Sequence, residues 1–173
     1  MRPRILATLL VLSIGTAGAL AATGSAQPNA LGDGCLVVKQ GYGKVVVTLT
    51  RGVVLGRFQE GSVSYSDTDG DATSTNLPKV PGVTPTKVGD HLWKFGPAVN
   101  VRFRSSGPTK LIVNAQLIDL SVAGKGTATV WTNGFIQEFA GQYSVDDDSF
   151  CEAGFKKMPL APTKVQISSP IAG

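Results

Sequence analysis

The sequence is poor in the residues from which most catalytic sites are built. Its 173 residues include one histidine, His91, and two cysteines, while charged residues make up 16% and aromatic residues 7%. No G-x-S-x-G nucleophile motif, phosphate-cradling loop or dinucleotide-binding glycine pattern occurs. One histidine cannot form a histidine-based metal centre, and a Ser-His-Asp triad would depend on His91 alone. We therefore expect no enzyme activity, with a carboxylate-based hydrolase left as an open alternative.

The positive charge of the chain does not indicate binding to nucleic acid. The formal charge is +4, but two of the sixteen basic residues, Arg2 and Arg4, lie in an N-terminal segment that we expect to be removed. The other fourteen are balanced by twelve Asp and Glu and are scattered along the sequence rather than clustered. A surface for nucleic acid or for an anionic membrane would show a basic patch or stripe. We expect neither kind of partner.

Long hydrophobic runs are absent except at the N-terminus, where the pattern is that of a secretory signal peptide. Two arginines precede an apolar run over 5–14, and small residues at 19–21 and 24–26 offer cleavage sites. The run falls short of the roughly 18 to 20 residues that a membrane-spanning helix requires. We expect residues 1–26 to be removed and the mature chain to have no membrane span. The predicted location is secreted, either extracellular or associated with the cell envelope.

The sequence does contain apolar residues that alternate with a period of two, which is typical of half-buried strands. In the segments 44–67 and 98–104, β-branched and aromatic residues occupy many alternate positions. In the second segment Val99, Val101 and Phe103 are predicted to face the core, with the polar residues between them outward. No segment has a convincing helical period, and the pattern predicts about nine to eleven short strands.

The predicted fold is a single all-β domain. Glycine reaches 21 residues and the charged content is low, which suits short strands joined by frequent turns. We predict an antiparallel β-sandwich or jelly-roll-like domain over 27–158, followed by a proline-containing C-terminal tail over 159–173. A right-handed β-helix is the alternative, because a rhythm punctuated by glycine suits either architecture.

The two cysteines, Cys35 and Cys151, frame this domain. In an exported protein an even number of cysteines favours a disulfide bond. A Cys35–Cys151 bridge would close a loop of 117 residues and, in the chain-entropy model, add about 4 to 5 kcal/mol to stability. Bridged Cα atoms lie within about 7 Å of each other, whereas the first and last coils of a parallel β-helix are several rungs apart. The predicted bridge therefore favours the sandwich.

Four stretches of strand and turn residues resemble a known group of proteins. They are 52–57 (GVVLGR), 101–104 (VRFR), 118–126 (IDLSVAGKG) and 141–144 (GQYS). These stretches look like those of small exported bacterial all-β proteins with no assigned activity. The resemblance implies an exported β-domain and carries no catalytic residues over to this chain.

Three alternate aspartates, Asp67, Asp69 and Asp71, are the best candidates for a metal site. Alternate carboxylates suit Ca²⁺, which takes six to eight oxygen ligands. The match to an EF-hand loop is partial, since glycine comes fourth rather than sixth and the twelfth residue is Pro78. The aspartates at 146–148 would add ligands if the two segments meet in space. The alternative is a pair of polar turns, in which Asp and Gly are common for local reasons.

A second candidate site consists of aromatic residues. His91, Trp93 and Phe95 alternate, so they are predicted to project to one face of a strand, and Trp131 would extend this aromatic strip. An exposed strip of this kind could stack on sugar rings. The competing interpretation is that Trp and Phe lie in the core, as they usually do in a small β-domain. The candidate ligand-binding residues are His91, Trp93 and Trp131.

We expect a secreted, non-enzymatic β-domain with a structural or surface-interaction role. The sequence does not identify the partner, although a cell-envelope glycan or protein fits the expected location. The alternative function is a small extracellular carbohydrate-binding module, assisted by Ca²⁺, and no other cofactor is expected. The connection over 67–90, whose prolines exclude a central strand, is the first candidate for a binding loop.

Overall fold

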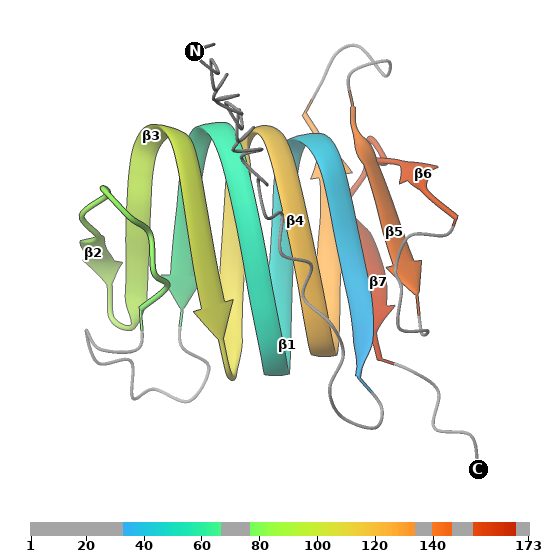
Figure 1. Cartoon of the computed structure of the whole chain (residues 1–173), viewed down its shortest axis with the longest axis horizontal. Coiled ribbons are helices and arrows are strands. Elements are labelled where there is room, and N and C mark those ends of the chain that lie inside the picture. Colours follow the sequence, from blue (N-terminus) through green and yellow to red (C-terminus); the bar gives the residue numbers. More distant parts are fainter. Residues whose placement is uncertain (1–32, 67–76, 134–139, 147–153, 169–173) are drawn as a thin grey trace, which may run out of the picture.

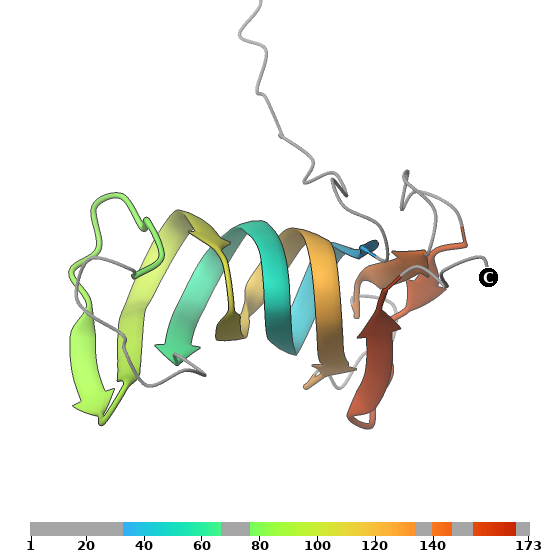
Figure 2. The same cartoon turned by 90° about the horizontal axis from the view of Figure 1, so that it is seen from below.

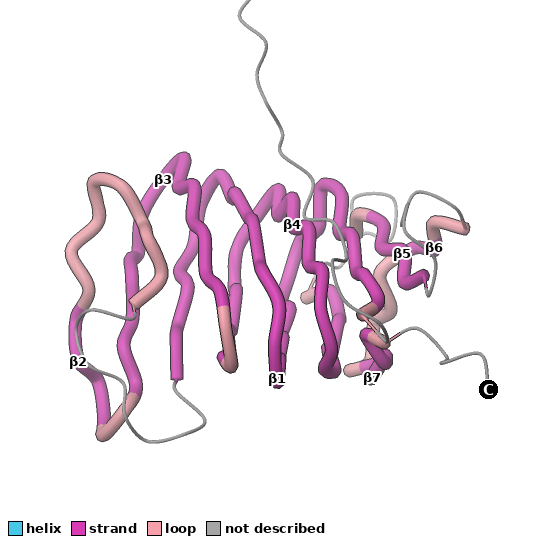
Figure 3. Tube along the Cα trace, turned by 60° about the horizontal axis from the view of Figure 1, so that its bottom comes forward, coloured by secondary structure: helices cyan, strands magenta, loops and turns pink. Residues whose placement is uncertain are grey.

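The computed structural model of the chain describes residues 33–66, 77–133, 140–146 and 154–168. These residues form seven β-strands and no helix, and therefore no helix able to cross a membrane (Figures 1 and 3). The prediction of an all-β fold is confirmed. The strands are β1 (Gly34–Ser66), β2 (Thr86–Gly89), β3 (Leu92–Ser106), β4 (Thr109–Thr132), β5 (Gln142–Asp146), β6 (Lys156–Lys157) and β7 (Thr163–Ile167).

The seven strands belong to one antiparallel sheet in the order β2-β3-β1-β4-β7, with β5 paired to β1 and β6 paired to β5. Figures 1 and 2 show that this sheet winds into a flattened coil, because β1, β3 and β4 bend from one layer into the other. Every pairing between the named strands is antiparallel, which agrees with the predicted antiparallel architecture and not with a parallel β-helix. The two layers are parts of a single continuous sheet.

The pairing of β1 with β4 shows how the coil is built. The segment 43–49 of β1 pairs on one side with 109–115 of β4 and on the other side with 126–132 of the same strand. The next segment of β1, 51–57, pairs with 119–125. Successive segments therefore lie in alternate layers. The front layer, nearer the viewer in Figure 1, contains 34–41, 51–57, 101–106, 118–124 and β5, and the back layer contains 43–49, 60–66, 92–95, 109–115, 126–132, β2 and β7.

Glycines nine residues apart mark the bends of β1. They are Gly34, Gly43, Gly52 and Gly61. The first and third of these pair with the same residue of β4, Gly124, and the second and fourth pair with Ala115. Nine residues thus carry the chain across one layer and into the next. The predicted count of nine to eleven short strands is wrong, because backbone pairing continues through glycines that the sequence pattern suggested as strand ends.

The core lies between the two layers and is apolar. Alternate residues of each segment are buried, among them Val45, Val47 and Leu49 in the back layer and Val101 and Phe103 in the front layer. The predicted alternation is confirmed at these positions. Removal of this apolar surface from water is the dominant favourable term in folding, at about 25 cal/mol per Å².

Val99 is the exception to the predicted alternation. Its side chain is 64% exposed, although the pattern of 98–104 placed it in the core. The next residue, Asn100, has a φ of 54°, which is left-handed rather than extended backbone. Asn100 lies in the bend of β3 between 92–95 in the back layer and 101–106 in the front layer, and its left-handed backbone changes the face to which the preceding side chain points. The prediction for Val99 is wrong for this reason.

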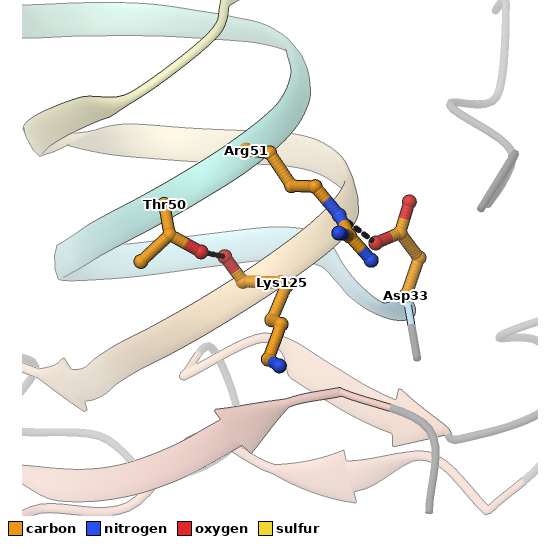
Figure 4. Close-up of polar contacts among 4 residues, drawn as sticks. All are labelled: Asp33, Thr50, Arg51 and Lys125. Atoms are coloured by element: carbon orange, nitrogen blue, oxygen red, sulfur yellow. Dashed lines mark hydrogen bonds and ion pairs between the residues drawn. The ribbon is translucent and has the colours of Figure 1, made fainter. Parts of the chain in front are cut away.

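Polar contacts connect the lower bends of the coil, which lie along the bottom of Figure 1 (Figure 4). The hydroxyl of Thr50 donates a hydrogen bond of 3.0 Å to the backbone carbonyl of Lys125. Nε of Arg51 lies 2.8 Å from Oδ1 of Asp33, whose carboxylate is buried. The bend of β1 at Thr50 and Arg51 is therefore tied both to the bend of β4 at Lys125 and to the residue before β1.

The segment predicted as a C-terminal tail takes part in the sheet. β7 pairs with β4 at the edge of the sheet. Ile167 is fully buried and Met158 also contributes to the core. This part of the chain is therefore structural over 156–167.

Two predictions fall partly or wholly on residues that are not described. Cys35 is buried at the start of β1, and the described residues include no free cysteine. Cys151 lies outside the described ranges, so the Cys35–Cys151 disulfide stays a prediction. The predicted signal peptide, residues 1–26, also lies outside them.

Candidate interaction surface

The predicted Ca²⁺ ligands, Asp67, Asp69 and Asp71, lie outside the described residues. The two acidic segments continue from Ser66 and Asp146. Ser66 ends the segment of β1 that pairs with β3, whereas Asp146 ends β5, which pairs with the opposite, N-terminal end of β1. The sheet therefore does not bring the starts of the two segments together. Within the described ranges, no group of three or more His, Cys, Asp or Glu is placed to hold a metal ion. The Ca²⁺ site stays a prediction.

The three predicted ligand-binding residues do not share one surface. His91 is exposed in the turn before β3, with a φ of 57°, and Trp93 packs against the core beside buried Phe95. Trp131 is on the outer side of the back layer, where Nζ of Lys44 lies 5.3 Å from the centroid of its ring. Three strand segments separate Trp93 from Trp131, which at about 4.8 Å per step places them about 19 Å apart.

A different set of residues comes together along the upper bends, which form the row of arches at the top of Figure 1. Neighbouring bends are joined by backbone pairing: Gly41 pairs with Ile118, Gln116 pairs with Glu60, and Glu60 pairs with Val99. The row therefore runs without a break across three strands. Its members are 40–43 and 58–61 of β1, 96–100 of β3 and 116–118 of β4, and we call them the upper bend row.

Three side chains of the upper bend row belong to residues with left-handed backbone. These are Gln40, Asn100 and Leu117, with φ of 52°, 54° and 47°. Within the described residues, His91 is the fourth non-glycine residue with positive φ. Left-handed backbone is unfavourable for a bulky residue such as leucine and costs of order 1 kcal/mol or more. Such strained residues concentrate at functional sites more often than elsewhere, so the row merits functional consideration.

Asp119 of β4 fixes two of these bends. Its Oδ1 accepts a hydrogen bond of 2.9 Å from the backbone N–H of Gln40. Its Oδ2 lies 2.7 Å from Nε and from Nη2 of Arg57, which precedes the bend of β1 at 58–61. A carboxylate that accepts a backbone N–H and a forked guanidinium forms charge-assisted hydrogen bonds, which are stronger than neutral ones. The bends of β1 at 40–43 and 58–61 are therefore linked through a single side chain of β4.

The chemistry of the row is amphipathic and largely uncharged. Amide groups come from Gln40, Gln59, Asn100 and Gln116, and one carboxylate comes from Glu60. Such groups offer both donors and acceptors to hydroxyl groups. Three of the five large hydrophobic residues that the described chain exposes are also in the row. They are Tyr42 at 37%, Leu117 at 48% and Val99 at 64%.

Four cations lie together on the outer side of the front layer, next to the upper bend row. Arg57 and Arg102 are direct cross-strand partners. Lys79 and Arg104 are also partners, joined by two backbone hydrogen bonds of 2.8 and 3.1 Å. Arg102 and Arg104 are two residues apart in β3 and therefore project to the same face. All four residues are exposed. We call Arg57, Lys79, Arg102 and Arg104 the arginine cluster.

Basic residues outnumber acidic residues within the described ranges, which contain fourteen Lys and Arg and five Asp and Glu. The expectation that basic residues are scattered rather than clustered holds along the sequence but not in space. Neither the upper bend row nor the arginine cluster was identified from the sequence, although the nine-residue spacing of glycines was a usable signal for the bends.

Comparison with protein-family models, with curated proteins and with solved structures finds no match to this chain. The resemblance to exported bacterial β-proteins stays a prediction. The function must therefore be inferred from the surface chemistry described above.

Proposed function

We propose that this protein is an exported, non-enzymatic β-domain that acts by surface interaction, and that the upper bend row is its interaction surface. The observation that supports this proposal most directly is the clustering of exposed amide, tyrosine and aliphatic side chains on four adjoining bends. Bends on a rigid sheet are suited to this role, because loops positioned by a rigid scaffold commonly carry binding residues.

The ionisable groups of the described chain support a role in binding rather than in catalysis. The side chain of Asp33 is buried, and its Oδ1 is already held at 2.8 Å by Arg51. A catalytic carboxylate is commonly one whose protonation is altered by burial and that faces a substrate site. The carboxylate of Asp33 is instead part of the contacts that tie the lower bends together.

The second candidate function is carbohydrate binding, and the amide groups of the row favour it. Sugars present hydroxyl groups that both donate and accept hydrogen bonds, and amide side chains do the same. Tyr42 adds an apolar ring with a polar hydroxyl at its edge. In this form of the proposal the partner is a glycan of the cell envelope or of the extracellular space.

A glycan array probed with the mature protein tests carbohydrate binding and, where binding is seen, the assignment of the upper bend row. We expect binding to a restricted set of glycans, with loss of signal in Tyr42→Ala and in Gln59→Ala. Gln166→Ala is the matched control, because Gln166 is an exposed amide on β7, away from the row. Equal binding by all three variants and the parent would contradict the assignment of the row. Absence of any glycan signal would contradict the carbohydrate-binding form of the proposal.

The same protein tests the expected help from Ca²⁺. If Asp67, Asp69 and Asp71 bind the ion, millimolar Ca²⁺ raises the melting temperature relative to EDTA, because a ligand of the native state stabilises that state. The triple substitution of these residues by Asn removes the rise. An identical melting temperature in Ca²⁺ and EDTA would count against the metal site while leaving glycan binding open.

A further inference from the structure

We propose that the arginine cluster binds the acidic groups of an anionic polysaccharide, that is, carboxylates or phosphates carried along a sugar chain. This inference rests on the proposed function, since it names the class of glycan that the surface takes. The cluster consists of Arg57, Lys79, Arg102 and Arg104 on three adjoining segments of the front layer.

The arrangement of the four cations is unfavourable for the isolated protein. Arg57 lies directly opposite Arg102, and Lys79 lies directly opposite Arg104. Like charges at directly opposed positions of an antiparallel pair destabilise a sheet. Two such pairs side by side concentrate positive charge in a small area. An anion bound between them would relieve the repulsion in both pairs.

The carboxylates of the described residues do not neutralise the cluster. In the described part of the chain, Arg57 is the one member of the cluster in an ion pair, and its partner is Asp119. That carboxylate also accepts the backbone N–H of Gln40, so both of its oxygens are engaged. The guanidinium groups of Arg102 and Arg104 are exposed and form no ion pair with a described carboxylate. A planar guanidinium binds carboxylate or phosphate through two parallel hydrogen bonds.

The position of the cluster explains why a glycan is favoured over a small anion. Arg57 is two residues before Gln59, and Arg102 is two residues after Asn100, so the cations adjoin the amides of the upper bend row. In an extended strand two residues span about 7 Å. A sugar chain that placed an acidic group on the cluster would therefore reach the amides with its neighbouring hydroxyl groups.

The lysines of the back layer differ from this cluster and provide a control. Across the strands Lys110 faces Thr48 and Ser66, while Lys164 faces Thr129. Neither lysine has a cation as its direct cross-strand partner. Both are exposed, so their substitution by Gln removes the same two charges as Arg102→Gln with Arg104→Gln.

Affinity electrophoresis and titration calorimetry of the mature protein test the proposal with polygalacturonate as the acidic glycan. The comparison probes are dextran as a neutral glycan, inorganic phosphate and free galacturonate as small anions, and single-stranded DNA as another polyanion. We expect polygalacturonate to bind the parent protein, with affinity at least about tenfold lower in Arg102→Gln/Arg104→Gln and within about twofold in Lys110→Gln/Lys164→Gln. Arg102→Lys/Arg104→Lys should recover only part of the loss, because the charge remains and the forked geometry does not.

Several outcomes would overturn the proposal. Equal weakening by the arginine and the lysine double variants would show that only net charge matters. Equal affinity for single-stranded DNA would show a general polyanion surface, and equal affinity per group for inorganic phosphate would show a small-anion site. If the parent protein does not bind polygalacturonate at all, this inference is wrong. If Arg102→Gln/Arg104→Gln nevertheless still binds dextran, the proposed glycan-binding function remains supported. A melting temperature within about 2 °C of the parent confirms that each variant is folded.

Discussion

Gly52 and Gly124 lie directly opposite each other where β1 and β4 bend, so close that neither has room for a side chain. A Cβ atom on Gly52 would lie 2.8 Å from Cα of Gly124, and a Cβ atom on Gly124 would lie 2.6 Å from Cα of Gly52. Both residues also have positive φ, at 139° and 150°, which side chains rarely adopt. The close approach of β1 and β4 at this bend therefore depends on two glycines.

Gly52→Ala should lower the free energy of unfolding by on the order of 3 kcal/mol, because the new methyl group meets backbone atoms that cannot move without breaking the pairing. Chemical denaturation measures the change. The control is Gly89→Ala, where the nearest atom to the added methyl group would be Cβ of Leu92 at 3.6 Å. A similar, small loss in both variants would mean that the bend adapts to a side chain.

The two ion pairs among the described residues should differ in their contribution to stability, although their distances are 2.8 and 2.7 Å. Arg51→Ala leaves the carboxylate of Asp33, which is 2% exposed, without its guanidinium, and should cost about 2 to 4 kcal/mol. Arg57→Ala leaves Asp119, which is 30% exposed, and should cost less than about 1 kcal/mol. Equal losses in denaturation experiments would contradict the role of burial. Restoring part of the loss with Arg51→Ala/Asp33→Asn would support it.

Trp93→Phe should leave stability unchanged or raise it slightly. The Nε1 group of Trp93 is buried and has no hydrogen-bond partner among the described residues, so the substitution removes an unsatisfied donor and keeps an aromatic ring against the core. Trp93→Ala should instead cost about 3 kcal/mol, since it leaves a cavity. Thermal and chemical denaturation of both variants provide the measurement. A loss in Trp93→Phe as large as that in Trp93→Ala would contradict this prediction.

Cys35→Ser/Cys151→Ser should destabilise the mature protein by about 4 kcal/mol, as expected for a disulfide that closes a loop of 117 residues. Cys35 and Leu36 are both buried, at 1% and 0% exposed, although successive residues of a strand point to opposite faces. The outer face of the sheet is therefore covered at this corner, as a bridge to another segment would require. Intact-mass measurement before and after reduction should differ by two hydrogens, and two free thiols in the native protein would contradict the bridge.

The sequence was sufficient to predict the fold class, because burial in a strand follows a period of two. Val45, Val47, Val101 and Phe103 are buried as the alternation predicted. The path of the chain was not predicted, since alternation reports which face of a strand is covered and not whether pairing continues through a glycine. The prediction for Val99 failed for a related reason. The bend at Asn100, where the backbone is left-handed, is set by the tertiary structure, and neither valine nor asparagine requires it.

The candidate surface was beyond the reach of sequence patterns. Arg57 and Arg102 are 45 positions apart, and Lys79 lies in a segment without strand character, so their proximity depends on the register of β1 with β3 and on one isolated bridge. The aromatic strip was predicted from local alternation alone. The structure separates Trp93 from Trp131 because they lie on opposite faces of the back layer, with three strand segments between them.

The nine-residue step of the glycines has a consequence for how such a chain can change in length. An insertion of one residue into β1 would move every later side chain of the strand to the opposite face of the sheet. An insertion of nine residues would move every later segment of the strand to the other layer. Only eighteen residues, one full turn, would return the chain to the same layer and the same side. Viable insertions and deletions in this architecture are therefore expected as whole turns, matched between β1 and β4, which would lengthen the coil without altering its cross-section.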